Sequence, residues 1–160
     1  MEHPIFPLIS IDTKYGAFDI IENAAAFSKA STRILINATY FDRVNLFDKN
    51  NSQWKYRQLS ADLKNNWVTK FLAKTVYNPV LDTEVTWIPN GFYQMKELKE
   101  KLKDCVDRDG DTITQFEEAD IIKIAIEKAV SFDEILNVLN KYVFDVDEEQ
   151  LWREQKARGE

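Results

Sequence analysis

The segment 107–118, DRDGDTITQFEE, holds five acidic side chains among its twelve residues. Its acidic residues are Asp107, Asp109, Asp111, Glu117 and Glu118. Carboxylates at this spacing could chelate a divalent cation, face a positively charged partner, or solvate a turn between two helices. These three uses predict different functions, so the surrounding residues have to be weighed against each of them.

The segment resembles the calcium loop of an EF-hand, which takes oxygens from positions one, three and five and a bidentate Glu from position twelve. Those positions hold Asp107, Asp109, Asp111 and Glu118. The sharp turn of such a loop needs Gly at position six, where this chain has Thr112, and Gly110 stands at position four instead. Divalent-cation binding is therefore an alternative, and neither a metal site nor a cofactor is predicted.

A helix cap is a competing use for the same residues. Thr114 and Glu117 have the spacing of a capping box, in which a hydroxyl and a carboxylate satisfy N–H groups at a helix start. Apolar residues at helical spacing follow, from Ile121 to Ala129. The segment is therefore predicted to be an acidic turn between helices, with Thr114 capping the second one.

Side chains that commonly perform catalysis are scarce. His3 is the only histidine, and Cys105, the only cysteine, has no other histidine to activate it. The four glycines form no phosphate-binding loop, and no Cys and His set could hold zinc. The four tryptophans are predicted to lie mostly in the core. The sequence therefore predicts a protein that is not an enzyme.

Charge is distributed unevenly along the chain. Residues 1–80 carry ten Lys or Arg and seven Asp or Glu, whereas residues 81–160 carry eleven and twenty. An acidic half disfavours nucleic acid, whose phosphates attract Lys and Arg, but it can steer a basic protein partner into contact. A second acidic group lies near Trp152 and consists of Asp145, Asp147, Glu148 and Glu149. Ordinary solvated helix surface is the alternative interpretation.

Length and hydropathy predict one domain over residues 1–160. The chain is 44% apolar, which is enough to build a core. No apolar run reaches the roughly 18 residues that a membrane span needs, and the N-terminus lacks the pattern of a signal peptide. With a single cysteine and no internal disulfide, these features favour a cytoplasmic protein without a membrane partner.

The chain to about residue 92 is predicted to be mainly β. The segments either side of DKNNSQ predict a β-hairpin, because Asp and Asn tolerate turn geometry. Residues 33–41 and 83–88 predict strands, the second ended by Pro89-Asn90-Gly91. Residues 19–29 predict a short helix. Ser60 could cap another, and residues 60–80 are compatible with either helix or strand.

The chain from about residue 93 to residue 158 is predicted to be mainly α, with three to four helices. Apolar stripes run from Met95 to Val106 and from Ile135 to Val143, the latter after a capping box at Ser131 and Glu134. The predicted fold class is α+β, an N-terminal antiparallel sheet with a short helix followed by a C-terminal helical segment.

The hairpin and the C-terminal helices together resemble the immunity proteins of bacterial toxin systems, including those of contact-dependent growth inhibition. The resemblance spans residues 15–142 and lies in DIIENAAAFSKAS, LFDKNNSQWKYRQL and DTITQFEEADIIKIAIEKAVSFDEILNVLNKY. It implies a small cytoplasmic protein that binds one cognate toxin domain and blocks its active site or substrate path. Such toxins are often nucleases with basic clefts.

An inhibitor of such a toxin can present carboxylates where the toxin expects phosphates, with a Tyr or Trp nearby as an anchor. The predicted partner-binding residues are Asp104, Asp107, Asp109, Asp111, Glu117, Glu118 and Asp120. Binding along the hairpin edge by β-augmentation is the alternative location. The alternative functions are a divalent-metal-binding protein and an acidic adaptor for a partner that is not a toxin.

Overall fold

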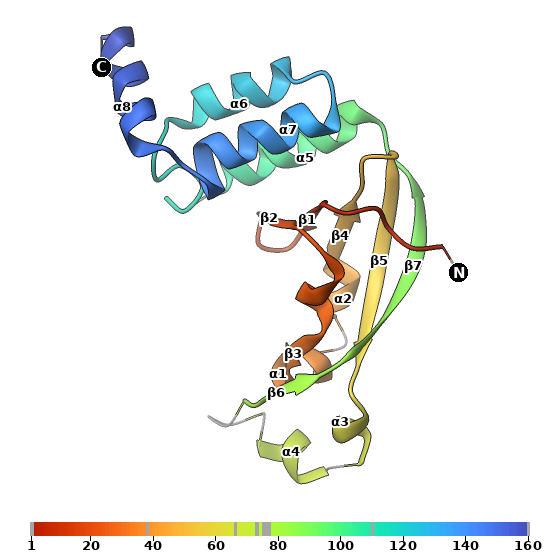
Figure 1. Cartoon of the computed structure of the whole chain (residues 1–160). Helices are drawn as coiled ribbons and strands as arrows, with labels where there is room; N and C mark the ends of the chain where they lie inside the picture. Colours follow the sequence, from red (N-terminus) through yellow and green to blue (C-terminus); the bar gives the residue numbers. More distant parts are fainter. Residues whose placement is uncertain are drawn as a thin grey trace. The chain divides into compact units, whose positions relative to one another are not determined.

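The computed structural model describes residues 2–37, 39–65, 67–72, 74, 78–109 and 111–159. Two compact units make up the chain (Figure 1). Unit 1 comprises residues 1–14 and 19–93, and unit 2 comprises residues 15–18 and 94–160. The predicted α+β class is confirmed, with an antiparallel sheet in the N-terminal half and helices after it. A single domain over residues 1–160 stays a prediction.

A five-stranded antiparallel sheet is the centre of unit 1, with strand order β2-β1-β4-β5-β7. Its strands are β1 (Leu8–Asp12), β2 (Ala17–Ile21), β4 (Val44–Phe47), β5 (Ser52–Leu59) and β7 (Glu84–Phe92). A smaller antiparallel pair joins β3 (Lys29–Ser31) to β6 (Val80–Asp82). The predicted hairpin is confirmed by β4 and β5, in which Leu46 lies opposite Trp54.

Strand β7 is longer than predicted, because it continues through Pro89-Asn90-Gly91 to Phe92. A register shift lets β5 follow it, so that Trp54 lies opposite Pro89 and Ser52 opposite Phe92. Strand β7 is the last in the sheet order, and an edge strand tolerates proline because its outer side needs no ladder hydrogen bond. Gly91 has a φ of 91°, a conformation that favours glycine.

The helix predicted for residues 19–29 is wrong. Strand β2, the 3₁₀ turn η1 (Ala24–Phe27) and strand β3 occupy this segment. The β-branched pair Ile20 and Ile21 suits a strand. Asn23 then caps the 3₁₀ turn, since its Oδ1 accepts a hydrogen bond from the Ala25 N–H at 3.0 Å. The apolar spacing that suggested one helix therefore belongs to two short elements.

The strand predicted for residues 33–41 is also wrong, since the segment forms helices α1 (Thr32–Ile36) and α2 (Tyr40–Arg43). Ser31 caps α1, its Oγ accepting from the Ile34 N–H at 3.4 Å, and the Thr32 hydroxyl donates to the Pro79 carbonyl at 2.9 Å. The residues of this segment that pack against the core are Ile34, Leu35, Tyr40 and Phe41. Tertiary burial here overrides β propensity.

Residues 60–80, which are compatible with helix or strand by sequence, contain helices α3 (Ala61–Asn65) and α4 (Trp67–Leu72), and strand β6 begins at Val80. Residues 66, 73 and 75–77 of this segment lie outside the described residues. The suggested cap at Ser60 is wrong, because its buried Oγ has no hydrogen-bond partner among the residues described.

Aromatic rings fill the core of unit 1. The core cluster contains Leu8, Phe27, Phe41, Val44, Leu46, Trp54 and Tyr56. The Phe27 ring lies edge-on to Tyr56 and Trp87, with centroids 4.9 and 4.8 Å apart. Burial of the Tyr56 hydroxyl raises its pKa well above the ordinary value. The core thus fixes the sheet and the short helices of this unit together.

The helices of unit 2 are α5 (Met95–Asp107), α6 (Ala119–Lys128), α7 (Phe132–Leu139), a π turn η2 (Asn140–Phe144) and α8 (Glu148–Arg158). The predicted apolar stripes are confirmed by fully buried Leu102, Ile122, Ile126, Ile135 and Leu139. Over the described ranges, none of the helices has the length and apolar character needed to cross a membrane.

In unit 2, one predicted helix cap is confirmed and one is wrong. Ser131 Oγ accepts from the Glu134 N–H at 3.2 Å at the start of α7. Helix α6, by contrast, begins at Ala119 rather than after Thr114. Its N-cap residue is Glu118, which makes no side-chain capping hydrogen bond. Thr114 and Glu117 therefore do not cap α6. Both belong to the segment predicted to bind a partner, where they make other hydrogen bonds.

Candidate partner-binding surface

The predicted binding residues lie in unit 2, where α5 ends and α6 begins. Asp104 and Asp107 belong to the last turn of α5, and Glu118 and Asp120 stand at the start of α6. The loop between these helices supplies the remaining three acids. Because α5 and α6 pack against each other, the acids occupy one connected segment between two fixed helix ends.

Asp109 turns inward and holds the loop. Its Oδ2 accepts hydrogen bonds from the N–H groups of Ile113 at 2.6 Å and Thr114 at 2.9 Å, and from the Thr114 hydroxyl at 3.2 Å. Its Oδ1 accepts from the Thr112 N–H at 3.1 Å. Both carboxylate oxygens are thus engaged by the loop, whereas a calcium ligand would need them for the metal.

The search for a metal site covers all of the described residues, including the acidic loop. Within those residues, no three or more His, Cys, Asp or Glu side chains are placed to hold a metal ion. The Thr114 hydroxyl belongs to the Asp109 network, and so it neither caps α6 nor faces a ligand. The loop resembles an EF-hand in sequence but uses its carboxylates differently.

The Asp109 network predicts a pH-dependent contribution to stability. Burial alone would raise the pKa of Asp109, but the hydrogen bonds from Thr114, Ile113 and Thr112 together lower it. A lowered pKa in the folded state stabilises the fold above the unfolded value of about 3.9, and this stabilisation is lost as pH falls through the folded pKa. Asp109→Asn should therefore lower the free energy of unfolding by about 1 kcal/mol at pH 7.

Urea unfolding at pH 7 and at a series of acidic pH values measures this contribution. The difference between wild type and Asp109→Asn should shrink below about pH 4 as Asp109 becomes protonated. Asp111→Asn is the matched control in the same loop, and it should change stability by less than about 0.5 kcal/mol at every pH. A difference that stays constant with pH would contradict the assigned role of Asp109.

Glu117 also turns inward. Its side chain is fully buried, and its Oε2 accepts a hydrogen bond from Arg158 Nη2 of α8 at 2.8 Å. Its Oε1 accepts from the Glu118 N–H at 3.0 Å. Gln155 strengthens the same attachment by donating to the Phe116 carbonyl at 2.9 Å. Glu117 therefore ties α8 to the acidic loop and cannot contact a partner directly.

Three of the remaining acids are exposed but form ion pairs. Asp104 pairs with Arg108 at 3.3 Å, and Lys123 contacts both Asp107 at 2.6 Å and Asp120 at 3.1 Å. Hydrogen bonds from Lys123 to these two carboxylates raise its pKa. Exposed pairs of this kind contribute little to stability, so a partner can replace them at small cost.

Asp111 and Glu118 are exposed, and their side chains make no hydrogen bond or ion pair with any residue that the structure describes. Asp111 adopts a φ of 74°, which Asp tolerates better than most residues. We define the acidic surface as the exposed carboxylates Asp104, Asp107, Asp111, Glu118 and Asp120. Five of the seven predicted residues thus remain available to a partner.

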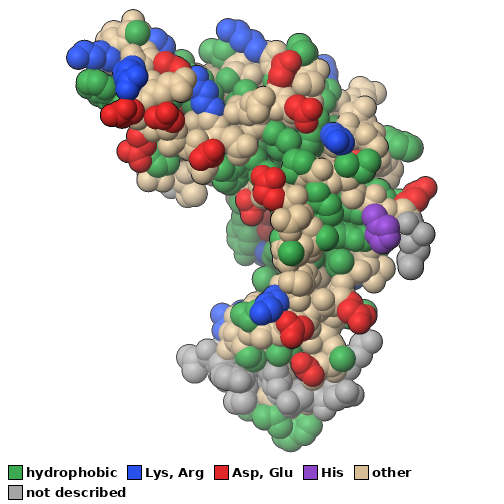
Figure 2. All heavy atoms as spheres, viewed as in Figure 1, with side chains coloured by type: hydrophobic (Ala, Val, Ile, Leu, Met, Phe, Trp, Pro, Cys, Tyr) green, Lys and Arg blue, Asp and Glu red, His purple; other side chains and the backbone are tan. Residues whose placement is uncertain are grey.

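The second acidic group has mostly local functions. Asp147 caps α8 by accepting from the Gln150 N–H at 3.0 Å, and Glu149 pairs with Arg153 at 2.8 Å. Trp152 is 60% exposed, with Lys156 placed 4.9 Å from the centre of its ring. Figure 2 shows carboxylates and cations interspersed on the visible face of the C-terminal helices. This group therefore offers a mixed surface rather than a uniformly negative one.

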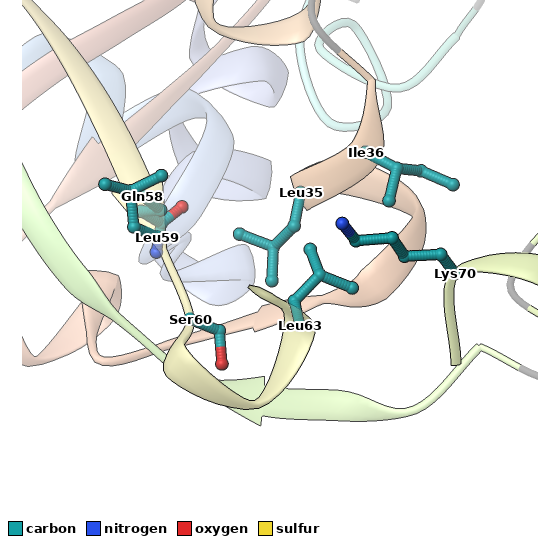
Figure 3. Close-up of a pocket in the computed structure, with 7 residues that line it drawn as sticks. All are labelled: Leu35, Ile36, Gln58, Leu59, Ser60, Leu63 and Lys70. Carbon is teal, nitrogen blue, oxygen red and sulfur yellow. The ribbon is translucent and has the colours of Figure 1, made fainter. Parts of the chain in front are cut away.

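Sequence reasoning missed an apolar surface in unit 1. Trp67 and Phe71, four residues apart on α4, are 76% and 63% exposed, although tryptophans were expected mostly in the core. A cavity of about 380 Å³ lies nearby (Figure 3). It is lined by Leu35, Ile36, Gln58, Leu59, Ser60, Leu63 and Lys70. The spacing of Trp67 and Phe71 was the available signal, since it places both on one helix face.

The acidic surface can attract and orient a positively charged protein, because among the described residues its five carboxylates form ion pairs with Arg108 and Lys123 alone. Comparisons with models of protein families, with curated proteins and with solved structures gave no match. A functional proposal therefore depends on the residues of this chain alone.

Proposed function

We propose that this protein is an immunity protein that binds and neutralises one bacterial toxin domain with a basic surface, such as a nuclease domain. The observation that carries the proposal is the acidic surface, whose five exposed carboxylates outnumber the two cations that pair with them in the described part of the chain. We place the protein in the cytoplasm, with the toxin domain as its partner in preference to nucleic acid or a membrane.

The arrangement of the inward-facing acids supports this proposal. Asp109 fixes the loop conformation and Glu117 attaches the loop to α8, so the exposed carboxylates are held on an ordered segment. A partner that binds an ordered surface loses less conformational entropy than one that binds a disordered segment. Negative charge on such a surface accelerates encounter with a basic partner and fixes its orientation.

Affinity capture tests the proposal at the level of the partner. The tagged protein is incubated with extract of its native cells at about 50 and 300 mM salt, and retained proteins are identified by mass. The proposal predicts one basic polypeptide that is retained in stoichiometric amount at both salt concentrations. Retention of a non-toxic partner would instead favour an acidic adaptor.

Removing charge from the acidic surface should slow association with that polypeptide. The double variant Asp111→Asn/Glu118→Gln removes two charges without breaking a side-chain hydrogen bond to any described residue. We expect the association rate constant at low salt to fall by about three- to tenfold, with little change in dissociation, because exposed charges act mainly on encounter. Surface plasmon resonance at several salt concentrations measures both rates.

The matched control removes two exposed carboxylates elsewhere, through Glu22→Gln/Asp133→Asn, and so produces the same change in net charge. Its association rate should stay within about twofold of wild type, because neither residue belongs to the acidic surface that is proposed to meet the partner. Equal slowing by both double variants would show a general charge effect. That result would remove the acidic surface as the binding site.

A further inference from the structure

The cavity of about 380 Å³ in unit 1 lies between α1, the end of β5 and the short helices α3 and α4 (Figure 3). Its apolar wall is supplied by Leu35 and Ile36 of α1, Leu59 of β5 and Leu63 of α3. Cavities of roughly 300 to 1,000 Å³ with a mostly apolar lining and a few polar groups are typical of sites for small molecules. The cavity therefore has the size and lining of a ligand site.

Hydrogen bonds hold two walls of this cavity in place. The Thr32 hydroxyl at the start of α1 donates to the Pro79 carbonyl at 2.9 Å. Near the end of β5, Gln58 Nε2 donates to the Phe27 carbonyl at 2.8 Å. Both bonds join segments that are distant in the sequence, so the cavity is formed by the fold itself. A ligand that enters a preformed site loses less free energy to ordering of the protein.

The apolar wall of the cavity remains partly open to water. Leu63 is buried, but Leu35 and Ile36 are only half-buried and Leu59 is 52% exposed. Removing such surface from water is favourable and scales with the area covered. A hydrocarbon group seated in the cavity would therefore bind through the hydrophobic effect.

Lys70 adds one positive charge to this apolar lining. Figure 3 shows its side chain extending from α4 toward Leu35 and Leu63. None of the described residues that line the cavity is acidic, and Lys70 makes no hydrogen bond or ion pair with any of the described residues. Lys70 is exposed, so water reaches its ammonium group, and an anion entering the cavity would replace that water by a charge-assisted hydrogen bond.

We propose that this cavity binds a small carboxylate with a hydrocarbon chain of about six to ten carbons, since roughly 30 Å³ for each non-hydrogen atom leaves room for about a dozen of them. The chain lies against the leucine side chains and the carboxylate meets Lys70 Nζ. A single lysine suits a singly charged head group, whereas a phosphate needs more donors. This site goes beyond the proposed function and does not depend on the partner being a toxin.

Titration of the full chain with butanoate, hexanoate and octanoate, followed by amide NMR shifts, tests the hydrocarbon part of the proposal. Affinity should rise about two- to fourfold for each added methylene group, because each one buries more apolar surface. The shifts should concentrate at residues 35–36, 58–60 and 63. Equal affinity along the series, or shifts spread evenly over the chain, would overturn the proposal.

Octanol, which has the same chain without the charge, tests the role of Lys70. Octanoate should bind at least about fivefold more tightly than octanol, and Lys70→Met should remove that difference while changing octanol affinity by less than about twofold. Lys70 is exposed, so its variant should keep the wild-type unfolding midpoint. Lys74→Met is the matched control, because Lys74 is exposed and does not line the cavity. Unchanged octanoate affinity in Lys70→Met, or an equal loss in Lys74→Met, would overturn the proposal.

A short peptide distinguishes a small carboxylate from an acidic protein segment as the occupant. Nα-acetyl-leucyl-glutamate amide carries an apolar group and a carboxylate on a peptide backbone. It should bind at least about tenfold more weakly than octanoate, because its peptide groups would meet an apolar wall without hydrogen-bond partners. Binding of the peptide as tight as that of octanoate would overturn the assignment to a small carboxylate.

Discussion

Replacing Asp48 by Ala should lower the free energy of unfolding by about 4 kcal/mol. Asp48 is 1% exposed and closes the turn between β4 and β5. Its Oδ1 accepts from the N–H groups of Asn50 at 2.9 Å and Ser52 at 3.1 Å, and its Oδ2 accepts from the Trp54 indole at 2.9 Å. The variant leaves the buried Trp54 indole and two partly buried backbone N–H groups without their acceptor, which costs more than the hydrogen bonds alone.

Urea unfolding followed by tryptophan fluorescence measures this loss. Asp48→Asn should cost about half as much, because it retains one acceptor oxygen while placing an amide donor near another donor. Asp19→Ala is the matched control, since Asp19 is exposed and, among the residues described, its side chain accepts only from the neighbouring Ile20 N–H. It should cost less than about 0.5 kcal/mol. A loss below about 1 kcal/mol for Asp48→Ala would contradict the role given to this carboxylate.

Replacing Arg158 by Met should lower the free energy of unfolding by about 2 kcal/mol. The substitution removes the cation that faces the fully buried Glu117 carboxylate at 2.8 Å. Arg158 is itself 30% exposed at its side chain, so water moderates the loss below that of a wholly buried pair. Helix α8 should loosen first, because Arg158 is one of its attachments to the acidic loop.

A double variant and a matched control isolate this pair. Glu117→Gln/Arg158→Met should recover at least half of the loss, since it no longer buries an unpaired charge. Arg153→Met makes the same substitution on the same helix, where Arg153 and Glu149 are both highly exposed, and should cost less than about 0.5 kcal/mol. Equal losses in Arg153→Met and Arg158→Met, measured by chemical denaturation, would contradict the buried pair.

The sequence was most informative where local chemistry and burial agree. The hairpin was predictable because DKNNSQ supplies turn residues and the strands on either side are apolar and aromatic. Helix α7 was predictable because Ser131 caps it and the apolar stripe that follows is buried. In both elements a short-range signal and the long-range packing favour the same structure.

Prediction failed where a distant contact decides the local structure. Thr32 begins α1 in a segment of β-forming residues because it donates to the Pro79 carbonyl, 47 residues away. Glu117 has the spacing of a helix cap but instead meets Arg158, 41 residues later. Neither partner can be inferred from periodicity. These long-range bonds explain why residues 33–41 form helices in place of the predicted strand and why α6 begins later than predicted.

The acidic binding site was predictable as a group but not residue by residue. Charge density alone selected all seven acids, and it could not separate Asp109 and Glu117, which face inward, from the five exposed carboxylates. That separation decides which variants test binding. Asp111→Asn and Glu118→Gln change the surface alone, whereas changing Asp109 also weakens the loop that supports it.

Growth of a sensitive bacterial host is the most direct measurement of the proposed function. The basic polypeptide retained in affinity capture is expressed from an inducible promoter, with and without this protein in the same cells. The proposal predicts that the polypeptide alone arrests growth and that co-expression restores it, with weaker protection by Asp111→Asn/Glu118→Gln than by Glu22→Gln/Asp133→Asn. Growth that is unaffected by the polypeptide, or arrest that co-expression fails to relieve, would contradict it.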